Sequence, residues 1–405
     1  MGKKVMWVSQ STTAKTGLAI SGRYILKGLQ KNGFEVFDVG YNFFPEGIKL
    51  NEISYDCRDL AFKSQQKVPA MLGDQVALYC KELNPDIIIF FGDIRYFTYL
   101  PSIIKDIGTK QLIGYITVDC SNLRYDWLPT LSCFNKLAVT SNFARQEIEL
   151  AYKMNSEVIY LGHDPKIFNE ENKQRDIAGL NKYNLIFLRI DRNQTRKNWT
   201  ALMDLWVDWI EDRQAGLLMH TRWEPEEESA PDLHYYITNM KKPVLNITKS
   251  ADYIDSAADY VRIMKNSDVF ITTTMGEGFG LPILESAACG IPTIGTNFSA
   301  SGELIKAGAG IAIEPAAFYA NSEGVKMSLP RVEEFKIIMS QLYNNPQRIK
   351  ELGSKAAKWA KQYTWDATVG KMVKLLEKPY YPSFLDVEVL ESTGNMRRLS
   401  LERLV

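Results

Sequence analysis

The sequence of 405 residues lacks several features that mark common classes of protein. Its 48 basic residues balance 48 acidic ones, so the charge of the whole molecule gives no indication of a polyanionic partner. The longest apolar runs, such as 87–91, are as short as strands, whereas a membrane-spanning helix needs about 20 residues. The N-terminal residues become polar too early for a signal peptide. We therefore expect a soluble, cytoplasmic chain with no integral membrane segment.

Patterns that bind metals or form disulfide frameworks are also missing. The five cysteines are odd in number and none lies in a Cys-x-x-Cys pair, which favours reduced thiols. The three histidines, His163, His220 and His234, form no cluster with cysteine, which argues against a zinc site. The tripeptide Asp-x-Asp does not occur, and the chain contains neither an internal repeat nor a low-complexity segment.

The chain does contain a regular alternation of short apolar runs and amphipathic stretches. Its hydrophobic share of 45% and charged share of 24% are those of a globular protein, long enough here for two cores. The apolar spacing predicts a helix at 21–32 that ends at Gly33. The strands predicted in this half are 5–8, 35–39, 87–91, 112–118 and 136–140. Strands that alternate with helices predict the α/β class with a parallel sheet.

The same alternation restarts after a polar stretch at 169–184. A helix is predicted at 200–212. The strands predicted in this half are 185–190, 216–221, 268–273 and 291–295. We therefore set a domain boundary between residues 172 and 173. Two parallel sheets facing each other form a cleft at the carboxyl ends of their strands, where ligands of such sheets bind.

The most informative segment is 275–287 (MGEGFGLPILESA), which follows a predicted strand. Its loop contains three glycines, Gly276, Gly278 and Gly280. Their amides can approach a ligand closely, and Pro282 suits the first turn of a helix predicted at 281–289. A glycine-rich loop that opens onto a helix N-terminus is a site for anions such as a diphosphate.

Two glutamates accompany this loop. Glu277 lies within it, where it can bind hydroxyls of a sugar, and Glu285 lies about two turns along the helix, where it can accept hydrogen bonds from a ribose. The alternative is a plain loop–helix junction with surface glutamates. The combination of glycines, proline and spaced glutamates disfavours that alternative.

Together these residues resemble the Glu-x7-Glu signature of family 4 of the retaining glycosyltransferases, also called glycosyl transferases group 1, which have the GT-B fold. Other segments are similar to that family in the same order along the chain: 138–143 (AVTSNF), 159–164 (IYLGHD), 192–197 (RNQTRK) and 363–366 (YTWD). The resemblance covers most of residues 1 to about 378.

The resemblance implies an α/β chain of two Rossmann-like domains facing across a cleft. Residues 1–172 would bind the acceptor and residues 173–364 the nucleotide sugar. The segment from about 365 would return to the first domain, with the tail to 405. For residues 396–405, which carry Arg397, Arg398 and Arg403, a packed or loosely ordered end is preferred over a surface helix.

The resemblance also implies roles for individual residues. The catalytic residues would be Arg192, Lys197, Glu277 and Asp119. The donor-binding residues would be Gly17, Arg196, Gly278, Phe279, Gly280, Leu281 and Glu285. Arg192 and Lys197 would grip the diphosphate and stabilise its charge as it leaves, whereas Arg196 either competes for that task or is simply solvated. No metal is implied, because Asp-x-Asp is usual where a divalent ion holds a nucleotide sugar.

Each of three residues, Asp119, Gly17 and His163, has two possible interpretations. Asp119, at the end of a predicted strand, either contacts the transferred sugar and assists deprotonation of the acceptor or caps the next turn. Gly17 would let the loop 12–22 approach the phosphates or the acceptor, although this loop lacks the paired glycines usual in the family. His163 is a tempting base, but its position at the domain junction favours a structural hydrogen bond.

The implied reaction is transfer of a hexosyl or pentosyl group, with retention, from a UDP- or GDP-sugar to an acceptor hydroxyl. The donor is a substrate, and no cofactor is expected. The acceptor is a glycan, a lipid, a metabolite or a modified base, so DNA is not excluded as a partner. The alternatives are a nucleotide-sugar epimerase or hydrolase on the same fold, or a non-catalytic nucleotide-sugar-binding protein.

Acceptor specificity would lie in the loops 41–70 and 95–102. Their aromatic residues either stack on a ligand or pack into the core: Tyr41, Phe43, Phe44, Tyr55, Tyr96, Phe97 and Tyr99.

Overall fold

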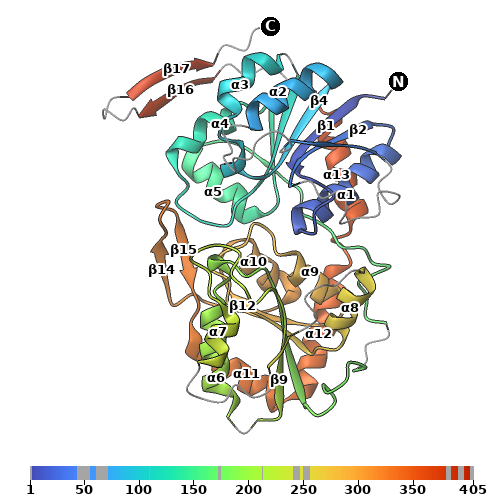
Figure 1. The fold of residues 1–405 in the computed structure, drawn as a ribbon, viewed down its shortest axis with the longest axis vertical. Coiled ribbons are helices and arrows are strands. Elements are labelled where there is room, and N and C mark those ends of the chain that lie inside the picture. The colour runs from blue at the N-terminus through green and yellow to red at the C-terminus, as the bar shows by residue number, and fades with distance from the viewer. Residues whose placement is uncertain are drawn as a thin grey trace. The chain divides into compact units, whose positions relative to one another are not determined.

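The computed structural model consists of two compact units (Figure 1). It describes residues 2–42, 55–60, 72–108, 110–171, 175–211, 213–239, 247–249, 256–379, 385–390 and 396–401. The first unit contains Met1–Val118, Asn122–Gly162 and Trp365–Val405. The second unit contains Asp119–Ser121 and His163–Thr364. The chain therefore contributes the three residues 119–121 to the second unit, returns to the first unit, and enters the second unit again at residue 163.

The first unit is built on a parallel sheet of seven strands in the order β3-β2-β1-β4-β5-β6-β7. Its strands are β1 Lys4–Gln10, β2 Glu35–Tyr41, β3 Asp56–Asp59, β4 Ile87–Asp93, β5 Gln111–Thr117, β6 Lys136–Val139 and β7 Glu157–Val158. The strand order changes direction between β1 and β4, as it does in doubly wound nucleotide-binding folds. The carboxyl ends of the strands are open to a ligand at such a point.

Helices connect these strands. They are α1 Gly17–Lys31, α2 Leu72–Leu83, η3 Ile94–Phe97, α3 Leu100–Ile107, η4 Tyr125–Trp127, α4 Leu128–Ser132, α5 Asn142–Tyr152 and α13 Trp365–Glu377. The last of these runs beside α1, where the rings of Tyr24 and Trp365 stack at 5.0 Å (Figure 1). The tail forms an antiparallel hairpin of β16 Leu385–Leu390 and β17 Met396–Leu401.

The second unit repeats the architecture with six parallel strands in the order β10-β9-β8-β11-β12-β13. Its strands are β8 Leu185–Ile190, β9 Ala215–His220, β10 Ile247–Lys249, β11 Val269–Thr272, β12 Thr293–Thr296 and β13 Gly310–Ile313, with a separate hairpin of β14 Ala317–Ala320 and β15 Lys326–Leu329. Its helices are η5 Thr195–Lys197, α6 Trp199–Ile210, α7 Leu233–Thr238, α8 Ala257–Lys265, α9 Leu281–Ala288, α10 Ser299–Leu304, η6 Ile305–Ala309, α11 Val332–Tyr343 and α12 Pro346–Ala360.

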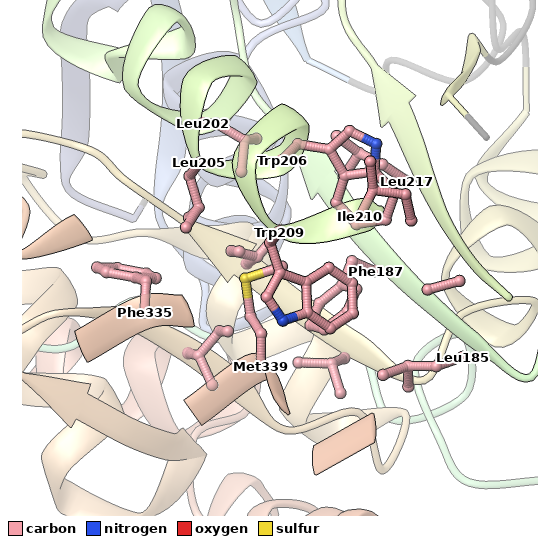
Figure 2. Packing of buried hydrophobic residues seen from close by; sticks show 14 of the residues in the cluster. Leu185, Phe187, Leu202, Leu205, Trp206, Trp209, Ile210, Leu217, Phe335 and Met339 are labelled. Atoms are coloured by element: carbon pink, nitrogen blue, oxygen red, sulfur yellow. The ribbon is translucent and has the colours of Figure 1, made fainter. Parts of the chain in front are cut away.

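Aromatic packing fastens α6 to the sheet of the second unit (Figure 2). Phe187 of β8 meets Trp206 and Trp209 edge to face, with ring centroids 6.0 and 5.5 Å apart. Phe335 and Met339 of α11 complete this cluster. A buried tryptophan removes about 150–250 Å² from water, worth about 4–6 kcal/mol at about 25 cal/mol/Å². The strand that leads into the candidate site is therefore firmly anchored.

The α/β class with two Rossmann-like units is confirmed. The strand predicted at 185–190 has the same bounds as β8, and the other predicted strands end within a few residues of the observed ones. The first unit ends at Gly162 instead of residue 172, because His163 pairs with the end of the second unit: its Nδ1 lies 2.7 Å from the carbonyl oxygen of Tyr363. The helix considered for the tail is wrong, since β17 pairs with β16.

The expectation for Gly17 also needs correction. Gly17 is the first residue of α1 and not part of a loop, because the Thr16 side chain caps the helix by accepting a hydrogen bond from the amide of Ala19 at 3.3 Å. The loop after β1 is anchored instead by Thr12, whose amide and hydroxyl donate to Asp38 at 2.8 and 2.6 Å.

The aromatic residues of the expected specificity loops divide into two groups. Tyr55, Phe97 and Tyr99 are buried, whereas Tyr96 is 42% exposed and its ring lies 5.4 Å from that of Tyr41. Phe43 and Phe44 lie outside the described residues. Among the helices of the described ranges, none combines the length and the apolar character needed to cross a bilayer.

Candidate functional site

The glycine-rich loop joins β11 to α9. Gly280 caps α9 with φ +100°, a left-handed conformation that strongly favours glycine, and Pro282 occupies the first turn of the helix. Gly276 packs against the backbone of Asp119, since a Cβ at this position would lie 1.9 Å from the Asp119 carbonyl oxygen. The loop therefore requires glycine at both ends, at Gly280 because of the backbone conformation and at Gly276 because the Asp119 backbone lies so close.

Glu277 is the centre of the site. It is 8% exposed, and its carboxylate accepts hydrogen bonds from Lys197 Nζ at 2.5 Å, Arg196 Nη1 at 3.1 Å and the Thr274 hydroxyl at 3.0 Å. Burial alone raises the pKa of this carboxyl group, but the charges of Lys197 and Arg196 outweigh burial and hold the pKa well below its usual range. Glu277 is therefore ionised and paired with two cations.

Lys197 lies between two carboxylates. Besides Glu277 it pairs with Asp191, which directly follows β8, and its own side chain is only 8% exposed. Asp191 in turn pairs with Arg189 at 2.7 Å. The Arg189 guanidinium is fully buried, lies 5.2 Å from the ring of Trp199, and donates to the Lys197 carbonyl oxygen at 2.9 Å. Arg189, Asp191 and Lys197 thus form a row of alternating charges that holds Lys197 in place.

Arg196 completes the cluster on its other side. Its Nη1 donates to the carbonyl oxygen of Gly276 at 2.8 Å, and its Nε lies 3.7 Å from the Asp119 carboxylate. Asp119 therefore belongs with the second unit, and its side chain is directed to this cluster. This position beside the cluster agrees with the site role expected for Asp119 and leaves the capping interpretation open.

Arg192 is not part of the cluster. Its Nε pairs with Glu226 at 2.5 Å, and its side chain is 55% exposed. Glu226 belongs to the loop 222–232, and the backbone of Asn193 accepts a hydrogen bond from the Glu226 amide at 3.0 Å. The Asn193 side-chain amide donates to carbonyl groups of the same loop, with Trp223 and Pro231 at 3.1 and 2.7 Å. Arg192 and Lys197, which were expected to act together, thus have different partners in this structure.

Glu285 forms a second, separate centre on α9. It is 5% exposed and accepts a hydrogen bond from the hydroxyl of Tyr260 at 3.0 Å. Burial raises the pKa of Glu285 to about 7, and the hydrogen bond from Tyr260 opposes that rise only in part. The rings of Phe168 and His220 each lie 6.1 Å from that of Tyr260, so aromatic rings surround the partner of Glu285.

The remaining expected donor-binding residues lie along the loop and at its junction with α9. Phe279 and Leu281 are buried, and Gly278 is half buried. Gly17 belongs to the first unit. Asp191 and Glu226 were missed by the sequence reasoning, although Asp191 directly follows a predicted strand and was open to the same argument as Asp119. In the described ranges no group of histidine, cysteine or acidic residues is arranged to hold a metal ion.

A family match covers the glycine-rich loop and α9. Residues 245–329 match the model of a family described as Glycosyl transferases group 1, and this stretch includes both Glu277 and Glu285. Over 120 residues the chain is 25% identical to D-inositol 3-phosphate glycosyltransferase of Rhodococcus opacus, a stretch that covers 30% of this chain and 23% of that protein. The match thus spans about a quarter of the length of the curated relatives.

Solved structures share the fold over nearly the whole chain. Sucrose-phosphate synthase from Thermosynechococcus elongatus has a TM-score of 0.76 at 14% identity, with 92% of this chain and 98% of that chain covered. HepE of Anabaena, in complex with UDP and glucose, has a TM-score of 0.73 at 15% identity, with 92% and 99% covered. A glycosyltransferase from Rickettsia africae has a TM-score of 0.71 at 16% identity, with 93% and 100% covered. The chain therefore has the GT-B fold, and its residues 245–329 are similar to the glycosyl transferases group 1 family.

Proposed function

We propose that the chain is a glycosyltransferase that moves a sugar from a nucleoside-diphosphate sugar to an acceptor hydroxyl. The observation that carries this proposal is the cluster of Lys197, Arg196 and Glu277 beside a glycine-rich loop at the N-terminus of α9. Two cations and a set of backbone amides at a helix N-terminus suit a diphosphate. A buried carboxylate between them suits the hydroxyls of the sugar.

The roles follow from this arrangement. Lys197 and Arg196 grip the diphosphate and stabilise the charge that develops as it departs. Arg192, whose side chain is 55% exposed, joins them when the donor replaces Glu226 as its partner. Glu277, with the amides of Gly278, Phe279, Gly280 and Leu281, orients the sugar and the phosphate. Glu285 accepts hydrogen bonds from the ribose, and Asp119 contacts the reacting part of the sugar.

The reaction proceeds with retention and without a bound metal. The diphosphate leaves, an oxocarbenium-like centre forms, and the acceptor hydroxyl attacks the same face while a phosphate oxygen accepts its proton. Cations of the protein supply the neutralisation that a divalent ion provides elsewhere. The five cysteines are thiols, in keeping with a cytoplasmic location. The HepE structure contains UDP and glucose, which makes UDP-sugars the first donors to test, followed by GDP-sugars.

The test begins with a thermal-shift screen of UDP-, GDP-, ADP- and TDP-sugars, with and without EDTA. We expect one donor class to raise the melting temperature whether or not EDTA is present. Turnover with that donor is then compared in Lys197→Ala and in Lys350→Ala, a control that removes an exposed lysine on α12. We expect a loss of about 100-fold or more in the first variant and wild-type turnover in the second.

Lys197→Gln is a second variant, because alanine leaves two buried carboxylates without their shared cation. Its melting temperature separates a loss of turnover from a loss of folding. Near-normal turnover in either Lys197 variant would refute the diphosphate role. Donor consumption that does not depend on any acceptor would instead favour a hydrolase or epimerase on this fold.

A further inference from the structure

Ser299 has an unusual backbone conformation beside the glycine-rich loop. It is the first residue of α10, it is 3% exposed, and its φ is +56°, in the left-handed region that side chains with a Cβ disfavour. The described non-glycine residues with positive φ are Asn42, Asn84, Asn122, Lys153, Asn198, Glu211 and Ser299. Among these, only Asn198 and Ser299 are buried, and asparagine tolerates this conformation better than serine.

The side chain of Ser299 makes a hydrogen bond that accounts for its presence. Its hydroxyl oxygen accepts a hydrogen bond from the amide of Glu277 at 2.8 Å. The next residue, Ala300, donates its own amide to the Glu277 carbonyl oxygen at 3.3 Å. Both backbone groups of Glu277 are therefore held by two consecutive residues that follow β12, a different strand from the one that carries the loop.

Glycine would adopt this backbone conformation without strain, yet serine occupies the position. With glycine there, the buried amide of Glu277 would lose its acceptor, and an unsatisfied buried donor is costly. A non-glycine residue in a disfavoured conformation is typical of sites where geometry matters more than stability.

We propose that Ser299 is a positioning residue that fixes the glycine-rich loop for the donor through the amide of Glu277. Lys197 and Arg196 hold the carboxylate of Glu277, while Ser299 holds its backbone, so the residue is fixed at both ends. The next amides along the chain, Gly278 to Gly280, are then preorganised for the ligand. The inference rests on the proposed donor role of this loop.

The first experiment needs no ligand. Hydrogen–deuterium exchange of the peptide 276–281 is compared in the wild type, Ser299→Ala and Ser299→Gly. The control is Ser267→Ala, which removes a buried serine hydroxyl that donates to the Ile263 carbonyl oxygen away from the loop. We expect exchange to accelerate about fivefold or more in both Ser299 variants and to stay at the wild-type rate in the control, because one hydrogen bond is lost. Unchanged exchange in both Ser299 variants would overturn the proposal.

The second experiment separates positioning from stability. Alanine keeps the strained conformation and glycine relieves it, so Ser299→Gly should melt at a higher temperature than Ser299→Ala. Both lack the hydroxyl, so with UDP-glucose as the probe we expect both to lose about tenfold or more in kcat, with a smaller change in KM. If Ser299 served stability alone, activity would follow the melting temperature, and a Ser299→Gly variant as active as the wild type would refute positioning.

The two proposals fail in different ways. A wild type that neither binds nor turns over any nucleotide sugar contradicts the proposed function, whereas the exchange experiment still reports on the loop. A wild type that turns over its donor, together with a fully active Ser299→Gly variant, contradicts only the role of Ser299.

Discussion

Asp191→Asn tests whether the row of buried charges formed by Arg189 and Asp191 supports Lys197. Asp191 supplies the carboxylate that pairs with Arg189 at 2.7 Å, and the Arg189 side chain is fully buried. Asparagine has nearly the same size, so the change removes the charge and little volume. A buried cation that loses its counter-ion destabilises a protein by about 3–5 kcal/mol. For a unit of this size the melting temperature should fall by roughly 10 °C.

Replacement of the other member of this ion pair, Arg189, should destabilise the protein less. Arg189→Met leaves Asp191 paired with Lys197, so no buried charge loses its only partner. Besides the ion pair with Asp191, this change removes the hydrogen bonds to the carbonyl oxygens of Lys197 and Ile271 and the contact with Trp199, worth about 1–3 kcal/mol together. The double variant removes both charges, so its cost should fall below the sum of the single costs by about 2 kcal/mol or more.

The assay is urea unfolding of the four proteins of this cycle, followed by tryptophan fluorescence. Five of the eight tryptophans, among them Trp199, Trp206 and Trp209 on α6, belong to the second unit, so most of the signal comes from that unit. A cost of less than about 1 kcal/mol for Asp191→Asn, or additive costs in the double variant, would show that Arg189 and Asp191 are not coupled. The row of charges would then have no part in supporting Lys197.

Three further predictions concern the loop, α9 and the acidic partner of Arg192. Gly276→Ala would bring a Cβ within 1.9 Å of the Asp119 carbonyl oxygen. We therefore expect calorimetry to show a free energy of unfolding lower by about 1–3 kcal/mol, together with lower turnover. An unchanged melting temperature would contradict the close approach. Burial raises the pKa of Glu285 from 4.5 to about 7, so between these pH values the folded state binds more protons than the unfolded state. The free energy of unfolding should therefore fall as pH rises from about 4.5 to 7, and Glu285→Gln should remove this pH dependence. A pH curve for that variant parallel to that of the wild type would exclude Glu285 as the source. Glu226→Gln frees Arg192 from an ion pair whose arginine is 55% exposed, so stability should change by about 1 kcal/mol at most. Affinity for UDP-glucose, measured by calorimetry, should rise a few-fold at low salt. Unchanged or weaker binding would show that Glu226 does not compete with the donor.

Local chemistry made much of the site predictable from the sequence. Gly280 and Pro282 mark the start of α9 through their own backbone preferences, and the structure has the helix beginning there. Lys197 and Glu277 were expected in one site, and they form an ion pair at 2.5 Å. Their positions after β8 and β11 explain this, because the carboxyl ends of neighbouring parallel strands meet at one edge of the sheet.

Direction and pairing of long side chains were not predictable in this way. Arg192 and Arg196 both follow β8, and nothing in their spacing tells which of them turns to Glu277 and which to Glu226. Glu226 lies more than 30 residues from Arg192, in a loop whose path depends on hydrogen bonds from Asn193. Only the folded chain decides such partners.

The sequence by itself therefore determined the α/β class, the two parallel sheets and the glycine-rich loop, because apolar periodicity and the preferences of glycine and proline act over short distances. Tertiary structure decided that Asp119 joins the second unit, that Arg189 and Asp191 support Lys197, and that Ser299 holds the amide of Glu277. The contacts of Asp119 and Ser299 join residues on different strands or loops. The energies of all these contacts depend on burial and on donor–acceptor geometry, which exist only once the chain has folded.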